Sequence, residues 1–68
     1  MSCLRIAPLI LEYRLEHRMN QSDFGALLGV SAQAVSKWER EICYPDVILL
    51  PTLAKILGVS VNMFFEEK

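Results

Sequence analysis

The sequence predicts an all-α fold of five helices without strands. Apolar residues recur at helical spacing in several segments, and residues that cap or stop helices separate those segments. The chain has 68 residues with a 53% hydrophobic content, which suits one small domain covering residues 1–68.

An opening helix is expected to have Pro8 in its first turn, where proline is tolerated, and to run to about Arg18. Four residues spaced along this segment are predicted to form the apolar stripe that packs on the rest of the fold: Leu9, Leu11, Leu15 and Met19.

The segment 21–40 carries the most informative pattern. Asn20 can cap a second helix, in which Phe24, Leu27 and Leu28 recur at helical spacing. Gly29 can adopt the left-handed conformation that ends a helix, and Ser31 can cap the next one. The chain is therefore expected to turn sharply between two short helices.

The third helix is predicted to begin at Ala32 and to have two different faces. Val35 and Trp38 lie three apart on a packing face, while the opposite edge offers small and polar side chains, namely Ala32, Gln33, Ser36, Lys37 and Arg40. Two helices joined by a short glycine turn form a helix-turn-helix, whose second helix can enter the major groove of DNA. Gly25 fits this motif because a larger residue would hold the two helices apart.

The remaining elements follow from proline, glycine and serine. Residues 41–45 are expected to form a loop, and Pro51 to lie near the start of a fourth helix that ends at Leu57 before Gly58. Ser60 can cap a short fifth helix from Val61 to about Phe65.

The phrases RMNQSDFGALLGVSAQAVSKWER, YPDV and LAKILGVSVNMFF follow one another in an order and spacing that resemble the Cro and phage-repressor (Xre-type) helix-turn-helix family. The resemblance covers roughly residues 5–65. It implies a compact five-helix lambda-repressor-like DNA-binding domain in which helices 2 and 3 form the motif. It also implies a homodimer.

The chain departs from the family where a glycine commonly follows Glu39, because here Arg40, Glu41, Ile42 and Cys43 follow instead. A glutamate at positive φ is costly, so we expect this loop to extend the helix or to take another turn type.

The charge balance limits how DNA can be bound. The formal net charge is −1; residues 1–40 hold five basic and four acidic residues, and residues 41–68 hold two basic and four acidic ones. Few cations are left for phosphates. We therefore expect binding that depends on helix N-termini and hydrogen bonds, with a modest salt dependence.

Two residues are predicted to read bases. Gln33 can form paired hydrogen bonds with adenine, and Lys37 can donate to guanine, although Lys37 can equally be an ordinary surface lysine. Ala32 can contact a thymine methyl, and Ser36 can reach a base or a phosphate.

Other residues are candidates for phosphate contacts. The resemblance places such a contact at Gln21, for which the alternative is a solvated glutamine at a helix start. Ser31, Arg40 and Tyr44 would flank the groove. Arg40 has a structural alternative, since a cation stabilises the C-terminal end of a helix.

Three further side chains are interpreted as structural. The resemblance implies a partly buried ion pair between Arg14 and Glu39, and Trp38 is expected in the core rather than as a platform for bases. His17 lacks a second metal ligand at helical spacing and is expected to be an ordinary surface side chain.

An apolar cluster near the C-terminus is the candidate dimer interface: Val59, Val61, Met63, Phe64 and Phe65. The alternative is that these residues close the core. Both readings are compatible if Phe64 points inward and Phe65 or Met63 outward.

No enzyme, metal or cofactor is expected, because the sequence lacks a glycine-rich phosphate loop and any arrangement typical of a catalytic triad. Cys3 and Cys43 are interpreted as packing residues in a reducing cytosol, although a disulfide or a redox role is an open alternative. The N-terminus does not resemble a secretory leader, and no apolar run approaches the roughly 20 residues that span a bilayer.

Two functions remain open. The first is a transcriptional regulator, more plausibly a repressor, which binds a near-palindromic operator as a homodimer in the cytoplasm. The alternative is an antitoxin-like or regulator-binding protein-interaction module of the same fold, which binds a protein partner through the Val59 to Phe65 surface.

Overall fold

The computed structural model describes residues 5–65, and these residues contain α-helices and 3₁₀ segments but no strand. The elements in chain order are α1 (Ile6–His17), α2 (Gln21–Leu28), α3 (Ala32–Glu39), η1 (Val47–Leu49), α4 (Leu50–Leu57) and η2 (Val61–Phe65). The all-α prediction is confirmed, with four α-helices in the described part of the chain.

The prediction of a fifth helix is wrong. Residues Val61–Phe65 form a 3₁₀ segment, in which the Met63 N–H donates to the Ser60 carbonyl three residues earlier. Five residues offer too few i→i−4 hydrogen bonds to offset the cost of nucleating an α-helix.

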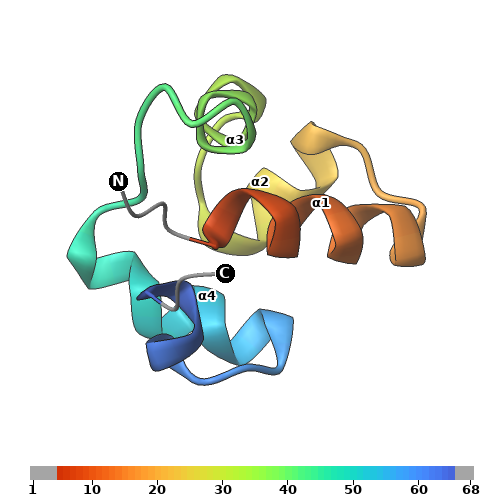
Figure 1. The fold of residues 1–68 in the computed structure, drawn as a ribbon. Coiled ribbons are helices and arrows are strands. Elements are labelled where there is room, and N and C mark those ends of the chain that lie inside the picture. The colour runs from red at the N-terminus through yellow and green to blue at the C-terminus, as the bar shows by residue number, and fades with distance from the viewer. Residues whose placement is uncertain (1–4, 66–68) are drawn as a thin grey trace.

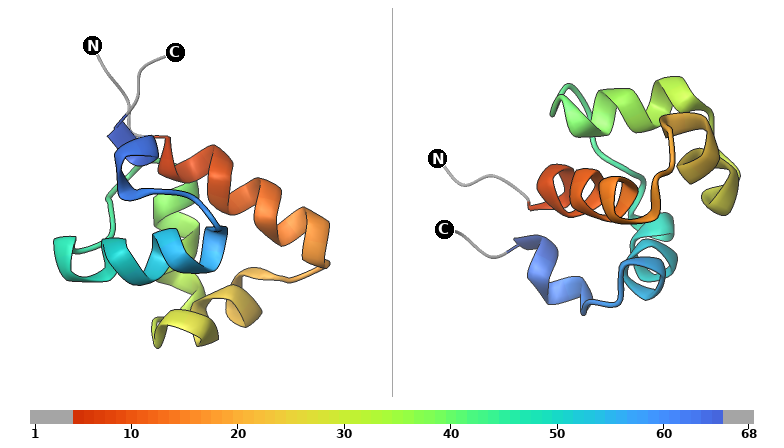
Figure 2. Two further views of the ribbon diagram at one scale, coloured as in Figure 1. Left: turned by 90° about the horizontal axis from the view of Figure 1, so that it is seen from below. Right: turned by 90° about the vertical axis from the view of Figure 1, so that its right-hand side faces the viewer.

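Helix α1 runs through the middle of the molecule. The α2–α3 pair packs on one side of it, and α4 with η2 lies on the other side (Figures 1 and 2). The two ends of the described chain meet, because the Arg5 backbone N–H donates to the Phe64 carbonyl at 2.8 Å. This arrangement leaves α3 at an outer edge of the fold.

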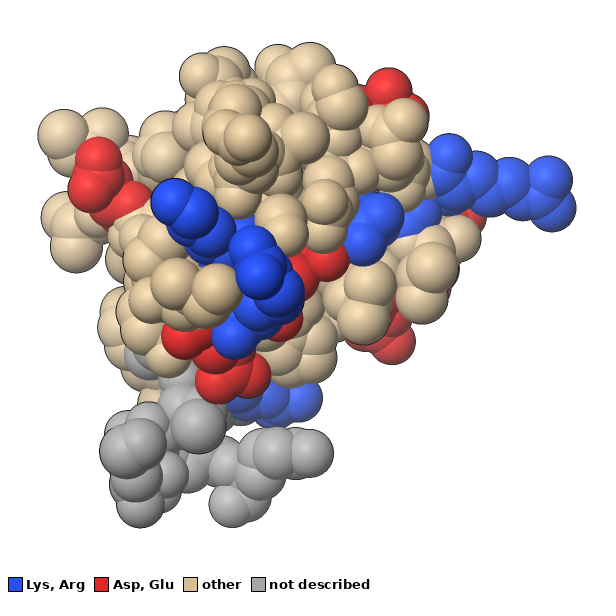
Figure 3. All heavy atoms as spheres, turned by 90° about the horizontal axis from the view of Figure 1, so that it is seen from above, with Lys and Arg blue, Asp and Glu red and all other residues tan. Residues whose placement is uncertain are grey.

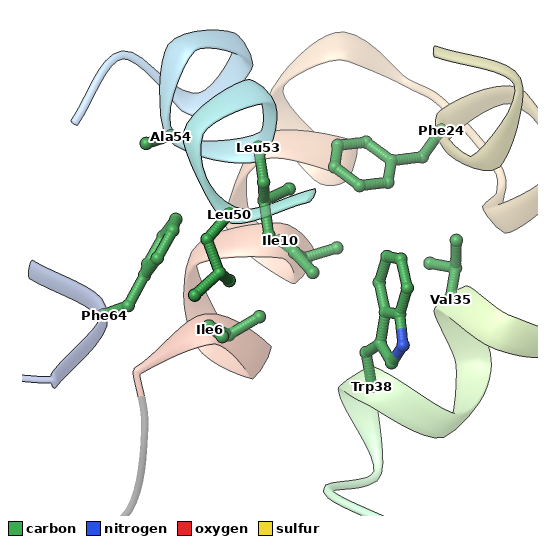
Figure 4. Close-up of a cluster of buried hydrophobic side chains, with 9 residues drawn as sticks. All are labelled: Ile6, Ile10, Phe24, Val35, Trp38, Leu50, Leu53, Ala54 and Phe64. Carbon is green, nitrogen blue, oxygen red and sulfur yellow. The ribbon is translucent and has the colours of Figure 1, made fainter. Parts of the chain in front are cut away.

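The core draws side chains from every α-helix and from η2 (Figure 4). As predicted, Phe24, Val35 and Trp38 are buried. The complete cluster is Ile6, Ile10, Phe24, Val35, Trp38, Leu50, Leu53, Ala54 and Phe64.

The predicted apolar stripe of α1 is wrong at two of its four positions, Leu11 and Leu15. Ile6 and Ile10 are buried, whereas Leu11 is 42% and Leu15 is 68% exposed. Leu9 and Met19 are only partly buried beside the core. Apolar residues occupy more than one face of α1, so helical spacing alone could not decide which face packs.

The predicted start and end of α2 are confirmed in detail. The Asn20 side chain accepts from the Asp23 N–H at 2.7 Å, and the Asp23 carboxylate accepts from the Asn20 N–H at 3.2 Å, which completes a capping box. Gly29 ends the helix with φ +74°.

Gly25 allows the turn to close against α2. A Cβ at this position would lie 2.6 Å from the Val30 carbonyl oxygen and 3.2 Å from that of Ser31. Because backbone atoms cannot move aside as a flexible side chain can, a larger residue would push the start of α3 away from α2.

The end of α3 differs from the prediction. The loop neither extends the helix nor abandons the left-handed turn, because Glu41 itself has φ +61°. The Ile42 N–H donates to the Lys37 carbonyl at 2.9 Å, and the Glu41 N–H donates to the Trp38 carbonyl at 3.2 Å. These two bonds form a Schellman motif, which satisfies the last carbonyls of α3 and offsets the strain at Glu41.

Candidate nucleic-acid interface

The polar edge of α3 faces solvent. Gln33 and Lys37 are exposed one helical turn apart, whereas Val35 and Trp38 on the opposite face are buried. Ala32 and Ser36 lie between the exposed and the buried face of the helix and are half-buried. The helix therefore combines an anchored face with an accessible edge of small and polar side chains.

Ser31 holds the start of α3. Its hydroxyl oxygen accepts from the Ala34 N–H at 3.1 Å, as expected of a capping serine. The hydroxyl hydrogen can still donate to a second group, and the residue is exposed.

Arg40 lies at the C-terminal end of α3, and Tyr44 lies in the loop that follows. The Arg40 side-chain Nε reaches back and donates to the Ser36 carbonyl at 3.4 Å, a contact that favours its structural role at the helix end. Tyr44 is 45% exposed in the loop after α3. Both side chains remain accessible.

The predicted partners Arg14 and Glu39 form a bidentate ion pair between α1 and α3. Arg14 Nε donates to Glu39 Oε2 at 2.6 Å, and the second bond reaches Oε1 at 2.9 Å. The two side chains are only 14% and 10% exposed. A further Arg14 nitrogen donates to the Met19 carbonyl at 3.1 Å, which ties the α1–α2 connection to the pair.

Gln21 joins this ion pair, a contact that the sequence analysis missed. Its side-chain amide donates to Glu39 Oε1 at 3.1 Å. Residues 21 and 39 lie on different helices, so no local spacing signals the contact. The Glu39 carboxylate therefore binds groups from α1 and α2 at once.

The network alters the proton affinity of its members. Burial acts to raise the pKa of the Glu39 carboxyl, but hydrogen bonds from Arg14 and Gln21, together with attraction to the Arg14 charge, lower it below its usual value. The hydrogen bond to Glu39 raises the pKa of Arg14. The pair stays ionised at neutral pH.

The start of α2 offers backbone donors beside this network. The first N–H groups of an α-helix have no acceptor within the helix, and in α2 these include Gln21 and Ser22. The Gln21 side chain donates to Glu39, so the backbone N–H groups at this helix start are the donors that remain for an anion.

The face that carries α3 is only weakly basic. Seen from above α3, Lys and Arg atoms form a broken band across a mainly uncharged surface, with acidic groups beside it (Figure 3). Exposed Lys37 and Arg40 belong to α3 and its C-terminal end. An anionic partner would therefore meet few cations on this helix.

The predicted dimer residues have different surroundings. Phe64 has no exposed surface and is a core residue, so it cannot itself contact a partner. Val59 and Val61 pack against the core, and Met63 is half-buried. Phe65 is 52% exposed and is the accessible member of the set.

The histidine and the exposed cysteine of the described residues do not form a metal site. His17 is exposed and lies against the Tyr13 ring, with 4.1 Å between the ring centroids. Cys43 is an exposed thiol rather than a packing residue, and Cys3 lies outside the described residues. Within residues 5–65, no three His, Cys, Asp or Glu side chains are grouped so that they could hold a metal ion. None of the helices in this range is long and apolar enough to cross a membrane.

The helix pair α2–α3, with its glycine turn and the exposed polar edge of α3, agrees with the match to a known family. A model of the helix-turn-helix family matches residues 10–64. The chain belongs to the helix-turn-helix family of the Cro and phage-repressor type. The predicted resemblance is confirmed. No curated protein sequence matches the chain.

Among solved structures, the P22 c2 repressor protein in complex with a synthetic operator is similar along nearly its whole length. The TM-score is 0.79 at 28% sequence identity, and the alignment covers 93% of this chain and 96% of the repressor chain.

A second neighbour is hydroxypropylphosphonic acid epoxidase from S. wedmorenis in complex with fosfomycin. Its TM-score is 0.71 at 24% identity, and the alignment covers 97% of this chain but only 35% of the epoxidase chain. At this identity the likeness shows the fold alone, and the matched region is about a third of the epoxidase chain.

Proposed function

We propose that this protein is a sequence-specific DNA-binding regulator, a repressor, which inserts α3 into the major groove of a near-palindromic operator. The observation that carries the proposal is the exposed edge of α3, where Gln33 and Lys37 project while Val35 and Trp38 anchor the helix. An anchored helix with a free polar edge is what direct readout of base edges requires.

Each residue of this edge has a role in the proposal. Gln33 forms paired hydrogen bonds with an adenine, and Lys37 donates to a guanine. Ala32 and Ser36 are small enough to let the helix approach the bases, and the alanine methyl can contact a thymine methyl.

Phosphates are held mainly by hydrogen bonds. The backbone N–H groups at the start of α2 and the Ser31 hydroxyl flank the groove on one side of α3, and Arg40 and Tyr44 flank its other end. Gln21 contributes through its backbone and through the orientation of its helix, because its side chain binds Glu39. With few cations involved, affinity falls only modestly as salt rises.

The protein acts as a homodimer in this proposal. Two copies related by a twofold axis present two α3 helices to half-sites about one helical turn, or roughly 34 Å, apart. The similar P22 c2 repressor was crystallised with a synthetic operator, which supports the binding of operator DNA. Repression follows if the operator overlaps a promoter.

Selection from a randomised duplex pool tests the function. We expect an enriched palindrome, and we expect Gln33→Ala and Lys37→Ala each to lose about 1–3 kcal/mol of preference for one base position. Lys55→Ala is the matched control, because Lys55 is an exposed lysine on α4, away from α3. It should retain the wild-type site preference.

A different outcome would favour the protein-interaction module. If no duplex is enriched at low salt while the chain remains folded, the sequence-specific DNA-binding proposal is wrong. Equal losses for Lys37→Ala and Lys55→Ala would also contradict it, since they would indicate nonspecific charge effects rather than base reading.

A further inference from the structure

The largest exposed apolar side chains near α3 lie outside the predicted dimer interface. Ile42 is 61%, Val47 78% and Ile48 83% exposed, and Tyr44 lies between them in sequence. We call these four residues, Ile42, Tyr44, Val47 and Ile48, the rim patch. They fall within seven consecutive residues that connect the end of α3 with α4.

The rim patch lies at a margin of the molecule. The segment that contains η1 forms the outermost edge on one side both in Figure 1 and in the view from below (Figure 2, left). The core has no need of these side chains, since Val47 and Ile48 point largely to solvent while the next residues, Leu49 and Leu50, turn inward. Exposed apolar residues so close together mark a contact surface.

We propose that the rim patch is the surface through which a second copy of this chain binds. The inference rests on the proposed function and deepens it, because it replaces the 59–65 surface as the dimer contact. Of that surface, Phe64 is inaccessible and Val59 and Val61 pack against the core, so only Phe65 offers a large exposed ring.

The position of the rim patch suits a second copy rather than an unrelated protein. The patch follows the end of α3 in the sequence, so a copy bound there lies near the C-terminal end of this helix, whereas Gln33 lies near its N-terminal end. The described fold measures 29 × 23 × 23 Å along its principal axes. Two such bodies in edge contact have centres about 23–29 Å apart, and their α3 helices, which lie at outer edges, can be farther apart than the centres, as half-sites roughly 34 Å apart require.

The charges around the rim patch also suit self-association. Exposed Arg40 precedes it, and exposed Glu41 and Asp46 lie beside and within it. In a twofold contact, residue i of one copy meets residue j of the other and the reverse. Arg40 of each copy can therefore pair with Glu41 or Asp46 of the other copy, so that two such pairs flank an apolar centre.

Sedimentation of the full chain without DNA, combined with binding to duplexes carrying one or two half-sites, tests the proposal. We expect Ile48→Asp and the neutral Ile48→Asn to weaken self-association about tenfold or more. On the palindrome both variants should lose cooperativity, while on a single half-site Ile48→Asn should bind like the wild type. The neutral variant separates loss of the apolar contact from repulsion between a new carboxylate and phosphates.

Two matched variants locate the contact. Leu15→Asp changes a leucine of α1 that is 68% exposed, and Phe65→Asp changes the 52% exposed ring of η2. Both should self-associate like the wild type. Circular dichroism of each variant confirms that it remains folded.

Several results would overturn the proposal. Ile48 variants that associate like the wild type would do so, as would a monomeric wild type that binds the palindrome without cooperativity. Loss of the dimer in Phe65→Asp or Leu15→Asp alone would assign the contact to another face. A wild-type dimer that binds no duplex would refute the proposed function but leave the rim contact supported by sedimentation.

Discussion

Helices α1 and α3 are both apolar enough to pack, yet only α3 reveals from its sequence which face it buries. In α3, Val35 and Trp38 occupy one face and polar residues the other, and the structure follows that division. In α1, buried Ile6 and Ile10 share the helix with exposed Leu11 and Leu15. A helix with one apolar stripe specifies its orientation, whereas a helix with two leaves the choice to its neighbours.

The exposed leucines of α1, Leu11 and Leu15, lie beside a hollow on the protein surface. Together with Pro8 and Leu9, they border this open hollow on the outer side of the helix, flanked by Arg5 and Glu12. None of the residues predicted to bind DNA lines this hollow, so the two helices expose surfaces of different character: a polar edge on α3 and an apolar one on α1.

The largest effect is expected at the anchored face of α3. Trp38→Ala should destabilise the protein by about 3–5 kcal/mol, because it removes a buried ring and leaves a cavity. A domain of this size has little stability to spare, so the variant should be largely unfolded by circular dichroism at 37 °C. Gln33→Ala on the exposed edge of the same helix is the control and should change the urea midpoint very little. Similar losses in both variants would contradict the division of α3 into two faces.

A pair of substitutions in α1 tests its two apolar faces. Ile10→Ala should cost about 3 kcal/mol, since Ile10 is fully buried. Leu15→Ala should change the free energy of unfolding by less than about 0.5 kcal/mol, because most of that side chain already meets water. Urea unfolding followed by tryptophan fluorescence measures both values. A larger loss of unfolding free energy in Leu15→Ala than in Ile10→Ala would support the apolar stripe predicted from the sequence.

The ion pair that joins the two helices should have the next largest effect. Arg14→Met leaves the largely buried Glu39 carboxylate with only the Gln21 amide, and we expect a loss of about 2–3 kcal/mol. The double variant Arg14→Met with Glu39→Met should recover much of this loss, because no charge is then stranded. A double-mutant cycle with a coupling free energy near zero would show that the pair contributes nothing.

The pH dependence of stability reports on the same pair. The folded-state pKa of Glu39 lies below its unfolded value, which is about 4.3 for a glutamate. The pair's stabilisation is therefore fully present above that pH and is lost as the pH falls through the folded-state pKa. Urea midpoints between pH 7 and pH 3 should converge for the wild type and Glu39→Gln at the acidic end. Parallel curves would show that Glu39 is not responsible.

The smallest effect is expected at the end of α3. Glu41→Gly should stabilise the protein by about 0.5–1 kcal/mol, because glycine adopts the observed positive φ without strain, although it costs more entropy on folding. Asp46→Gly, in the same loop but at φ −58°, is the control and should not stabilise. A less stable Glu41→Gly would indicate that the carboxylate has a role of its own.

Residues 20–39 were predictable because their signals are local. The Asn20 and Ser31 caps bond to residues three positions later, and the stop at Gly29 depends on its own φ, so neighbouring residues suffice to place α2 and α3. The end of α4 at Gly58 follows from the same logic. The family resemblance implied the Arg14–Glu39 ion pair, and the structure shows that the contact is bidentate.

The sequence by itself determined the all-α class, the helix-turn-helix and the polar edge of α3, because capping, helical period and left-handed stops act over three or four residues. The left-handed turn at Glu41 is stabilised by local hydrogen bonds to Lys37 and Trp38, but the residue type at that position does not signal it. Only the tertiary structure decided which side of α1 is buried and that Gln21 binds Glu39, because these contacts join residues far apart in the chain, whose energies no local pattern records.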